Sequence, residues 1–254
     1  MALAPLEVLV AGTGAPVTVV AHGLGGSIRE TRPLVGGVAG SRVFYAARGH
    51  GSSPLGPEPV TYDLLGRDLG AVAAEHGATR ALGVSMGAGA VLSLLAREPA
   101  RFERVVLFLP AALDRPRDPA GAARAGDLAT ALEAHDRERV GALVAAELPP
   151  DLPGPVRAYV RARTDFLLAS PGVAAVLRSL PGSRPVDDRG ALGAVSAEVL
   201  VLAQEGDALH PAQVARDLAA VLPEARLEVF DRPGVVFRER ARLRELVVGF
   251  LGSD

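Results

Sequence analysis

The sequence predicts an α/β protein with a mostly parallel central sheet, helices on both faces and a helical lid insertion. Short β-branched runs alternate with helical patterns over most of the chain, and one long helical stretch breaks this alternation. The strands are expected at residues 7–10, 17–21, 42–46, 80–84, 105–109, 199–203 and 227–230. The helices of the core are expected at residues 64–75, 85–97, 211–221 and 238–251.

Residues 114–190 form the stretch that interrupts the alternation. They contain no strand-like run, and repeated prolines divide them into helical pieces. An insertion that follows a late strand of an α/β sheet often acts as a lid. We therefore expect a core made of residues 1–113 and 191–254, with residues 114–190 as the lid.

Composition excludes several classes of function. A net charge of −2 gives no reason to expect a nucleic-acid partner, and the absence of cysteine removes thiol catalysis and disulfides. The sequence has no run of 18 apolar residues and no signal-peptide pattern, so we expect no membrane partner and a cytoplasmic location. The histidines lack metal-ligand spacing and no dinucleotide fingerprint occurs, so we expect no metal and no cofactor. The oligomeric state stays open.

The most informative motif is Gly83-Val84-Ser85-Met86-Gly87, a G-x-S-x-G between an expected strand and an expected helix. A serine on such a turn is held in a strained conformation with its Oγ exposed. This context predicts that Ser85 is a nucleophile.

A glycine-rich loop, His22-Gly23-Leu24-Gly25-Gly26, follows the expected strand at residues 17–21. Gly23 allows the backbone to approach a substrate closely, and the N–H groups of Leu24 and Met86 can then form an oxyanion hole. The alternative is a tight turn without a catalytic role.

An acidic residue, Asp207, stands just past the expected strand at residues 199–203. Catalytic groups collect at the carboxyl ends of such strands, and the order serine then aspartate fits this architecture. The alternative is that Asp207 caps the helix that follows. We favour Asp207 over Asp114 as the acid.

These motifs, with Arg48-Gly49-His50-Gly51-Ser52-Ser53 after the strand at 42–46, resemble the α/β-hydrolase fold superfamily in its lid-bearing branch. The resemblance runs over nearly the whole chain. It implies a serine nucleophile at Ser85, an oxyanion loop braced by His22, and a catalytic acid at Asp207.

The resemblance also implies a catalytic histidine in the loop after the last strand, typically following a glycine. Here Val235 follows Gly234, and no histidine occurs after His210. His210 lies three residues after Asp207 and precedes Pro211, so it is expected at a helix N-terminus, which favours a neutral imidazole. His210 is therefore a relocated general base, a helix N-cap, or a residue of the pocket wall that closes over the sheet.

The other histidines are expected in different roles. His76 is expected at a helix end, His135 on a solvated lid face and His50 in a structural loop.

The sequence accordingly predicts a serine hydrolase that acts on an ester, a thioester or a lactone, with an atypical or absent general base. The expected partner is a small hydrophobic molecule, because the lid contains a set of apolar side chains that either contact it or pack within the lid. These are Tyr159, Phe166, Leu167, Leu168, Val173, Val176 and Leu177. The alternatives are a non-hydrolytic lyase or cyclase, and a catalytically inactive ligand-binding relative.

Overall fold

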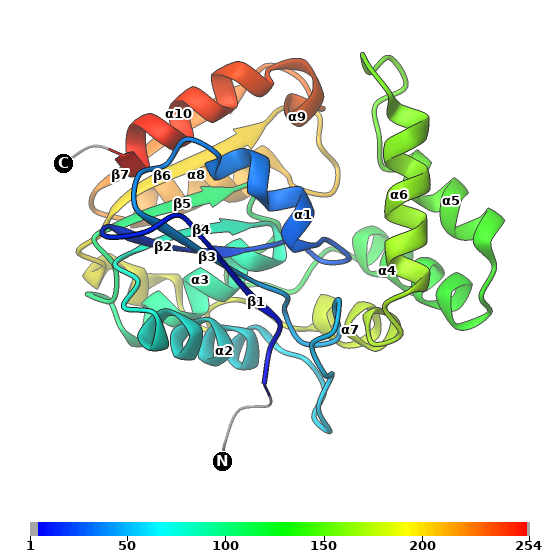
Figure 1. Cartoon of the computed structure of the whole chain (residues 1–254), viewed down its shortest axis with the longest axis horizontal. Coiled ribbons are helices and arrows are strands. Elements are labelled where there is room, and N and C mark those ends of the chain that lie inside the picture. The colour runs from blue at the N-terminus through cyan, green and yellow to red at the C-terminus, as the bar shows by residue number, and fades with distance from the viewer. Residues whose placement is uncertain (1–4, 253–254) are drawn as a thin grey trace.

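A computed structural model describes residues 5–252 and contains a seven-stranded sheet in the order β1-β3-β2-β4-β5-β6-β7 (Figure 1). The strands are β1 (Val8–Ala11), β2 (Val17–Ala21), β3 (Ser41–Tyr45), β4 (Arg80–Val84), β5 (Arg104–Phe108), β6 (Glu198–Gln204) and β7 (Ala225–Phe230). Only β1 is antiparallel to its neighbour, and every other pair is parallel. The predicted fold class is confirmed, and the strand ends differ from the expected ones by at most two residues.

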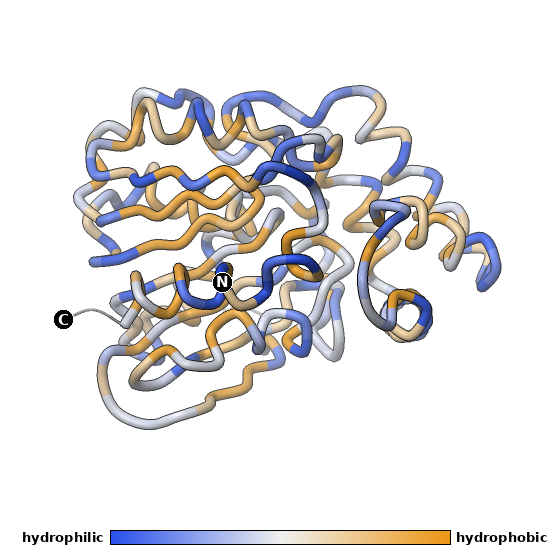
Figure 2. Tube along the Cα trace, turned by 90° about the horizontal axis from the view of Figure 1, so that it is seen from above, coloured by the Kyte–Doolittle hydropathy of each residue, from blue (hydrophilic) through white to orange (hydrophobic). Residues whose placement is uncertain are grey.

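Alternate residues of the strands enter two separate cores, one on each face of the sheet. Val105 and Leu107 of β5 pack with the helices α2 (Tyr62–Glu75), α3 (Met86–Arg97) and α8 (Ala212–Val221). Val106 and Phe108 pack on the other face, with η1 (Arg32–Val35), α9 (Val235–Arg238) and α10 (Arg240–Gly252). Strands buried on both faces read as nearly continuous apolar runs, and Figure 2 shows them as orange lines through the sheet.

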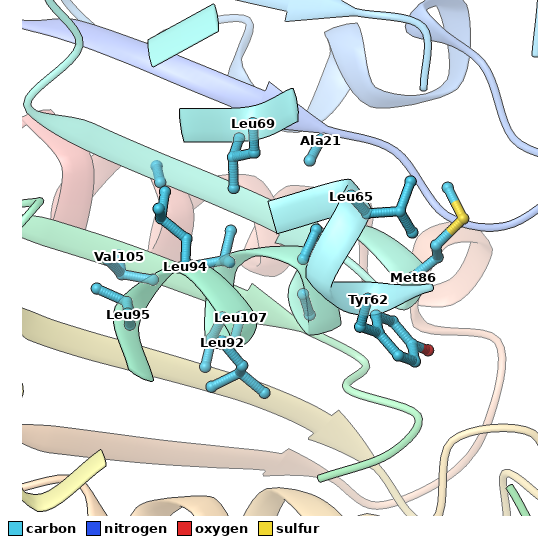
Figure 3. Close-up of a cluster of buried hydrophobic side chains, with 14 of the residues drawn as sticks. Ala21, Tyr62, Leu65, Leu69, Met86, Leu92, Leu94, Leu95, Val105 and Leu107 are labelled. Atoms are coloured by element: carbon cyan, nitrogen blue, oxygen red, sulfur yellow. The ribbon is translucent and has the colours of Figure 1, made fainter. Parts of the chain in front are cut away.

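The larger core lies between the central strands and two long helices. Leu65 and Leu69 of α2 belong to the same buried cluster as Leu92 and Leu94 of α3 (Figure 3). Each of these leucines is at most 1% exposed, and full burial of such a side chain contributes about 1.5–3 kcal/mol. This packing fixes α3, and therefore the turn that precedes it, against the sheet.

The core helices lie close to their expected positions, but two of them differ at their N-terminal ends. The helix expected at residues 85–97 starts at Met86, because Ser85 has a φ of 51° and cannot continue a helix. The segment expected as one helix at residues 238–251 is divided into α9 and α10. The short helix α1 (Ile28–Thr31) and η1, which follow the glycine-rich loop, were not expected.

The stretch between β5 and β6 is helical, as its sequence indicates. It contains α4 (Pro119–Glu133), α5 (Arg137–Ala146), α6 (Val156–Leu168), α7 (Val173–Ser179), η2 (Leu180–Gly182) and η3 (Arg189–Ala194). The helices α4 to α7 lie beside one end of the sheet in Figure 1 and share an apolar cluster of their own. The division into a core of residues 1–113 and 191–254 and a lid of residues 114–190 stays a prediction. Within the described residues, no helix has the length and apolarity needed to cross a bilayer.

Gly87 lets α3 contact the neighbouring strand β2. A Cβ atom on Gly87 would lie inside the van der Waals distance of the Ala21 carbonyl group, which is backbone and cannot move aside. The close approach of α3 to β2 therefore requires glycine at this position.

We expect Gly87→Ala to lower the free energy of unfolding by about 1–3 kcal/mol, because the added methyl group forces α3 away from β2. Denaturant titration followed by circular dichroism measures this loss. Gly193→Ala is the matched control, since a Cβ there meets no atom within 4 Å. Equal stability of the two variants would contradict the close contact.

Candidate active site

Ser85 occupies a strained turn between β4 and α3. Its φ of 51° and ψ of −105° lie outside the strand and helix regions. The Ser85 N–H donates to the Phe108 carbonyl oxygen at 2.9 Å, and the Ser85 carbonyl oxygen accepts from the Gly89 N–H at 3.1 Å. Strand β5 and helix α3 thus hold the turn from both sides, and the serine is 8% exposed.

The structure brings Ser85, His210 and Asp207 into one continuous chain of hydrogen bonds. The Ser85 Oγ lies 2.9 Å from His210 Nε2, and His210 Nδ1 lies 2.9 Å from Asp207 Oδ2. An ionised carboxylate only accepts, so Nδ1 carries the proton and the Nε2 lone pair faces the serine hydroxyl. A neutral imidazole in this tautomer is able to take the proton of Ser85.

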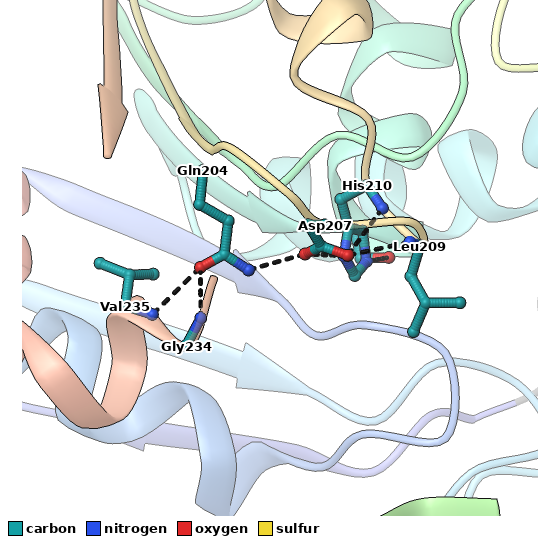
Figure 4. A network of polar contacts seen from close by, with 7 residues as sticks. Gln204, Asp207, Leu209, His210, Gly234 and Val235 are labelled. Atoms are coloured by element: carbon teal, nitrogen blue, oxygen red, sulfur yellow. Dashed lines mark hydrogen bonds and ion pairs between the residues drawn. The ribbon is translucent and has the colours of Figure 1, made fainter. Parts of the chain in front are cut away.

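The Asp207 carboxylate is held by four donors. Its Oδ1 accepts from the N–H groups of Leu209 and His210 at 2.9 and 3.1 Å, and its Oδ2 accepts from His210 Nδ1 and from Gln204 Nε2 (Figure 4). Burial raises the pKa of Asp207, but the hydrogen bonds from His210, Gln204 and Leu209 outweigh burial and hold the pKa well below its usual value. Asp207 therefore stays ionised, and its backbone contacts fold the loop so that His210 turns back toward it.

Val235 does not reach the serine site. It is 1% exposed, packs in the core on the α9 and α10 face, and begins α9. Its N–H donates to Gln204 Oε1 at 3.0 Å. The loop in which the resemblance implies a histidine is thus used to begin a helix.

In the glycine-rich loop, hydrogen bonds to the Gly23 carbonyl oxygen fix the peptide group between Gly23 and Leu24. The Gly23 carbonyl oxygen accepts from His22 Nδ1 at 2.7 Å and from the Gly26 N–H at 2.9 Å. The N–H of that peptide belongs to Leu24, and within residues 5–252 it has no hydrogen-bond partner. A Cβ on Gly23 would lie 3.5 Å from Ser85 Cβ, so this peptide lies beside the serine.

The N–H of Met86 is the second free donor. Met86 is the first residue of α3, so its N–H has no partner inside the helix, and no other group among the described residues accepts from it. The N–H groups of Leu24 and Met86 are thus two unpaired donors near Ser85. Met86 follows Ser85 in the chain, and Leu24 follows Gly23, which lies beside Ser85 in space.

Two buried imidazoles brace this loop. His22 Nε2 accepts from the Ala47 N–H, and His50 Nε2 accepts from the Gly25 N–H, each at 2.9 Å. The two rings meet edge to face with centroids 4.8 Å apart. Burial lowers the pKa of His22, and burial together with the neighbouring His22 lowers the pKa of His50 to about 3. Both rings stay neutral, which the acceptor role of each Nε2 requires.

The helices between β5 and β6 contact the same loop through Arg163 of α6. One guanidinium nitrogen, Nη2, donates to the Leu24 carbonyl oxygen at 3.3 Å, while Nη1 pairs with Glu30 at 3.1 Å. Four of the apolar residues named from the sequence in this stretch are buried: Leu167, Val173, Val176 and Leu177. The ring of Tyr159 instead packs edge to face on Phe237 of α9.

The remaining candidates form no hydrogen bond or ion pair with Ser85, Asp207 or His210 within residues 5–252. Asp114 forms a two-bond ion pair with Arg189, at 2.6 and 2.8 Å. His76 ends α2, and His135 is exposed after α4. Among residues 5–252, no three His, Asp or Glu side chains gather closely enough to hold a metal ion.

Sequence reasoning missed Gln204, the contact of His50 with Gly25, and the contact of Arg163 with Leu24. A signal existed for Gln204, since it is the one polar residue after a run of five apolar residues in β6. For His50 the signal was weaker: the loops after residues 17–21 and 42–46 follow strands that pair in parallel, so both loops emerge at the same edge.

Comparison with known proteins agrees with this architecture. The family model described as alpha/beta hydrolase fold matches residues 16–234. The chain belongs to the α/β-hydrolase fold family. A comparison with curated protein sequences gave no match.

Solved structures resemble this α/β hydrolase over almost its full length. An esterase from Exiguobacterium antarcticum aligns with a TM-score of 0.79 and 19% identity, covering 98% of this chain and 96% of the esterase. The enol-lactonase from Burkholderia xenovorans LB400 aligns with a TM-score of 0.79 and 24% identity, with the same coverage. MenH from S. aureus aligns with a TM-score of 0.76 and 18% identity, covering 96% and 97%. At these identities the likeness establishes the fold alone.

The neutral state of His50 predicts how stability depends on pH. Between pH 6.5 and about 3 the unfolded chain binds a proton at this position that the folded chain does not, so the free energy of unfolding falls as the pH falls. The slope contributed by His50 reaches about 1.4 kcal/mol per pH unit. We expect His50→Gln to be less stable than the unmodified protein at pH 7 but to lose less stability between pH 7 and pH 5.

Urea titrations at several pH values measure both slopes. His135→Asn is the control, because His135 is exposed and asparagine tolerates its φ of 51°. The interpretation is wrong if His50→Gln keeps the full pH slope.

Proposed function

We propose that this α/β hydrolase is a serine hydrolase that cleaves a small, apolar ester, thioester or lactone. The observation that carries the proposal is the hydrogen-bonded chain from Ser85 Oγ through His210 to Asp207. It has the geometry of a catalytic triad, with the base three residues after the acid and not in the loop after β7. The esterase and the enol-lactonase among the similar structures suggest the substrate classes to test first.

The proposed first half-reaction forms an acyl-enzyme. As Ser85 Oγ attacks the carbonyl carbon, its proton passes to His210 Nε2, and the imidazolium is stabilised by the Asp207 carboxylate. The carbonyl oxygen becomes an oxyanion that accepts from the Leu24 and Met86 N–H groups. His210 then gives its proton to the leaving oxygen or sulfur as the carbonyl bond to that atom breaks.

The proposed second half-reaction uses the same groups with water. His210 Nε2 takes a proton from a water molecule, whose oxygen attacks the acyl carbon. Collapse of the second tetrahedral intermediate breaks the bond to Ser85 Oγ, which regains a proton from His210. The products are a carboxylic acid and an alcohol or thiol, or a single hydroxy acid when the substrate is a lactone.

We expect Ser85→Ala to remove turnover of p-nitrophenyl butyrate and His210→Gln to lower kcat by about 10²–10⁴-fold, because the nucleophile then lacks its base. Steady-state kinetics measures both effects. A fluorophosphonate probe should label Ser85 in the unmodified protein and much more slowly in His210→Gln.

His76→Gln is the matched control, since His76 ends α2 and touches none of these groups. Full activity of His210→Gln would rule out the relocated base. Absence of both turnover and labelling in the folded protein would favour a non-hydrolytic enzyme or a ligand-binding relative.

The contact between the insertion and the oxyanion loop makes a separate prediction. Arg163→Met removes a donor from the Leu24 carbonyl oxygen and the partner of Glu30, so the peptide group that follows the Leu24 N–H loses a support. We expect kcat to fall about tenfold, less than the ~10²–10³-fold cost of losing an oxyanion donor outright, with little change in KM. Kinetics of Arg163→Met against Arg161→Met, an exposed arginine of the same helix, tests this. Identical kcat values would contradict a role of the insertion in the oxyanion hole.

A further inference from the structure

Gln204 ends strand β6 and is buried, with 6% of its surface exposed. A buried carboxamide is costly unless its donors and acceptor are used. Its Oε1 accepts from the Gly234 and Val235 N–H groups at 2.9 and 3.0 Å, and its Nε2 donates to Asp207 Oδ2 at 2.7 Å. Two backbone donors on one side and a carboxylate on the other allow only this orientation of the amide.

The carboxylate oxygen that Gln204 contacts is the one that faces the imidazole. Asp207 Oδ2 accepts from both Gln204 Nε2 and His210 Nδ1, while Oδ1 is occupied by backbone N–H groups. Rotation of the carboxylate would therefore break the contact with Gln204 as well as the contact with His210. The glutamine supplies a neutral donor, so it supports the ionised aspartate without offering a competing positive charge.

The other end of the same amide holds the loop after β7. Gly234 precedes α9 and has a φ of 91°, and Val235 is the first residue of α9. The first N–H groups of a helix have no partner inside it, and Gln204 Oε1 accepts from two such donors. One buried side chain thus joins the beginning of α9 to the loop that carries Asp207 and His210 (Figure 4).

We propose that Gln204 is a positioning residue that holds the Asp207 carboxylate in line with His210 and ties it to the loop after β7. This inference rests on the proposed function for its kinetic consequence. Its structural content, the alignment of Asp207 with His210, does not depend on which reaction the site performs.

Two variants separate the parts of this role. Gln204→Leu removes the donor and the acceptor, whereas Gln204→Glu keeps an acceptor for Gly234 and Val235 and replaces the donor by a second carboxyl group. The net free energy of a hydrogen bond to a charged group corresponds to a factor of about 10 to 100 in a rate constant. We expect Gln204→Leu to lower kcat by about that factor with KM within threefold.

The charge of the second carboxyl group provides a pH readout. Two carboxylates in hydrogen-bond contact cannot both be ionised without repulsion, and only the protonated form can donate to Asp207. The ionisable groups joined to this position are Asp207, which Gln204 contacts directly, and His210, which contacts Asp207. Arg238 of α9 lies near Gly234, and its guanidinium is engaged by the Pro233 carbonyl oxygen and by Asp151. We expect the kcat of Gln204→Glu, relative to the unmodified protein, to rise as the pH is lowered from 8 to 6.

A readout besides activity is the ¹H NMR resonance of the His210 Nδ1 proton, identified by its loss in His210→Gln. We expect Gln204→Leu to shift or broaden this resonance, because the carboxylate that accepts the proton is no longer held. Gln213→Leu is the matched control: it removes a glutamine donor to Asp217 on the surface of α8 and should change neither kcat nor the resonance.

The outcomes separate the two proposals. A folded Gln204→Leu with unchanged kcat and an unchanged resonance would overturn the positioning role, and so would a Gln204→Glu/unmodified kcat ratio that does not vary with pH. If Gln204→Leu does not fold, the pH dependence of Gln204→Glu decides. If the unmodified protein neither hydrolyses esters nor reacts with a fluorophosphonate, the proposed function fails, and the resonance in Gln204→Leu still tests the position of Asp207.

Discussion

The backbone turn at Ser85 is the constraint on which the candidate site depends. A positive φ at a serine is unfavourable by itself, so the surrounding structure has to impose it. Two neighbouring elements impose it. The Phe108 carbonyl oxygen of β5 accepts from the Ser85 N–H, and Gly87 of α3 lies against β2. The core leucines of α2 and α3 hold α3 in that position. The burial of apolar surface thus stabilises the fold and also maintains the strained turn.

The loops around Ser85 are held by polar groups that are themselves buried. His22 and His50 each lie between two loops, and both act as acceptors of backbone N–H groups through Nε2. Such a role is available only to a neutral imidazole, which the apolar surroundings favour. The Gly23 carbonyl oxygen accepts two hydrogen bonds, which fix the peptide group whose other end is the Leu24 N–H. Within residues 5–252 that N–H has no hydrogen-bond partner. An unpaired and rigid donor is what stabilisation of an oxyanion requires.

The residues predicted as acid and base lie closer together in the chain than the resemblance implies. Asp207 and His210 share one loop after β6, and the backbone contacts of the Asp207 carboxylate bend that loop. The loop after β7 carries no histidine and leads into α9, with Gln204 Oε1 accepting from the Gly234 and Val235 N–H groups. The catalytic roles of Ser85, Asp207 and His210 remain predictions, and the contacts among them are the structural basis for those predictions.

The sequence by itself determined the fold class, the seven strands and the turn at Ser85, because these follow from local patterns: β-branched runs, helical periodicity and a G-x-S-x-G between them. It also indicated His210 and Asp207 as candidates from their spacing and their place after β6. Tertiary structure alone decided that His210 Nε2 reaches Ser85 Oγ, because 125 residues separate the two and only the parallel order of β4, β5 and β6 brings their carboxyl ends together. The roles of His50, Arg163 and Gln204 likewise depend on contacts between distant segments. A local pattern can mark such a residue, as it does Gln204, but it does not identify the residues that it contacts.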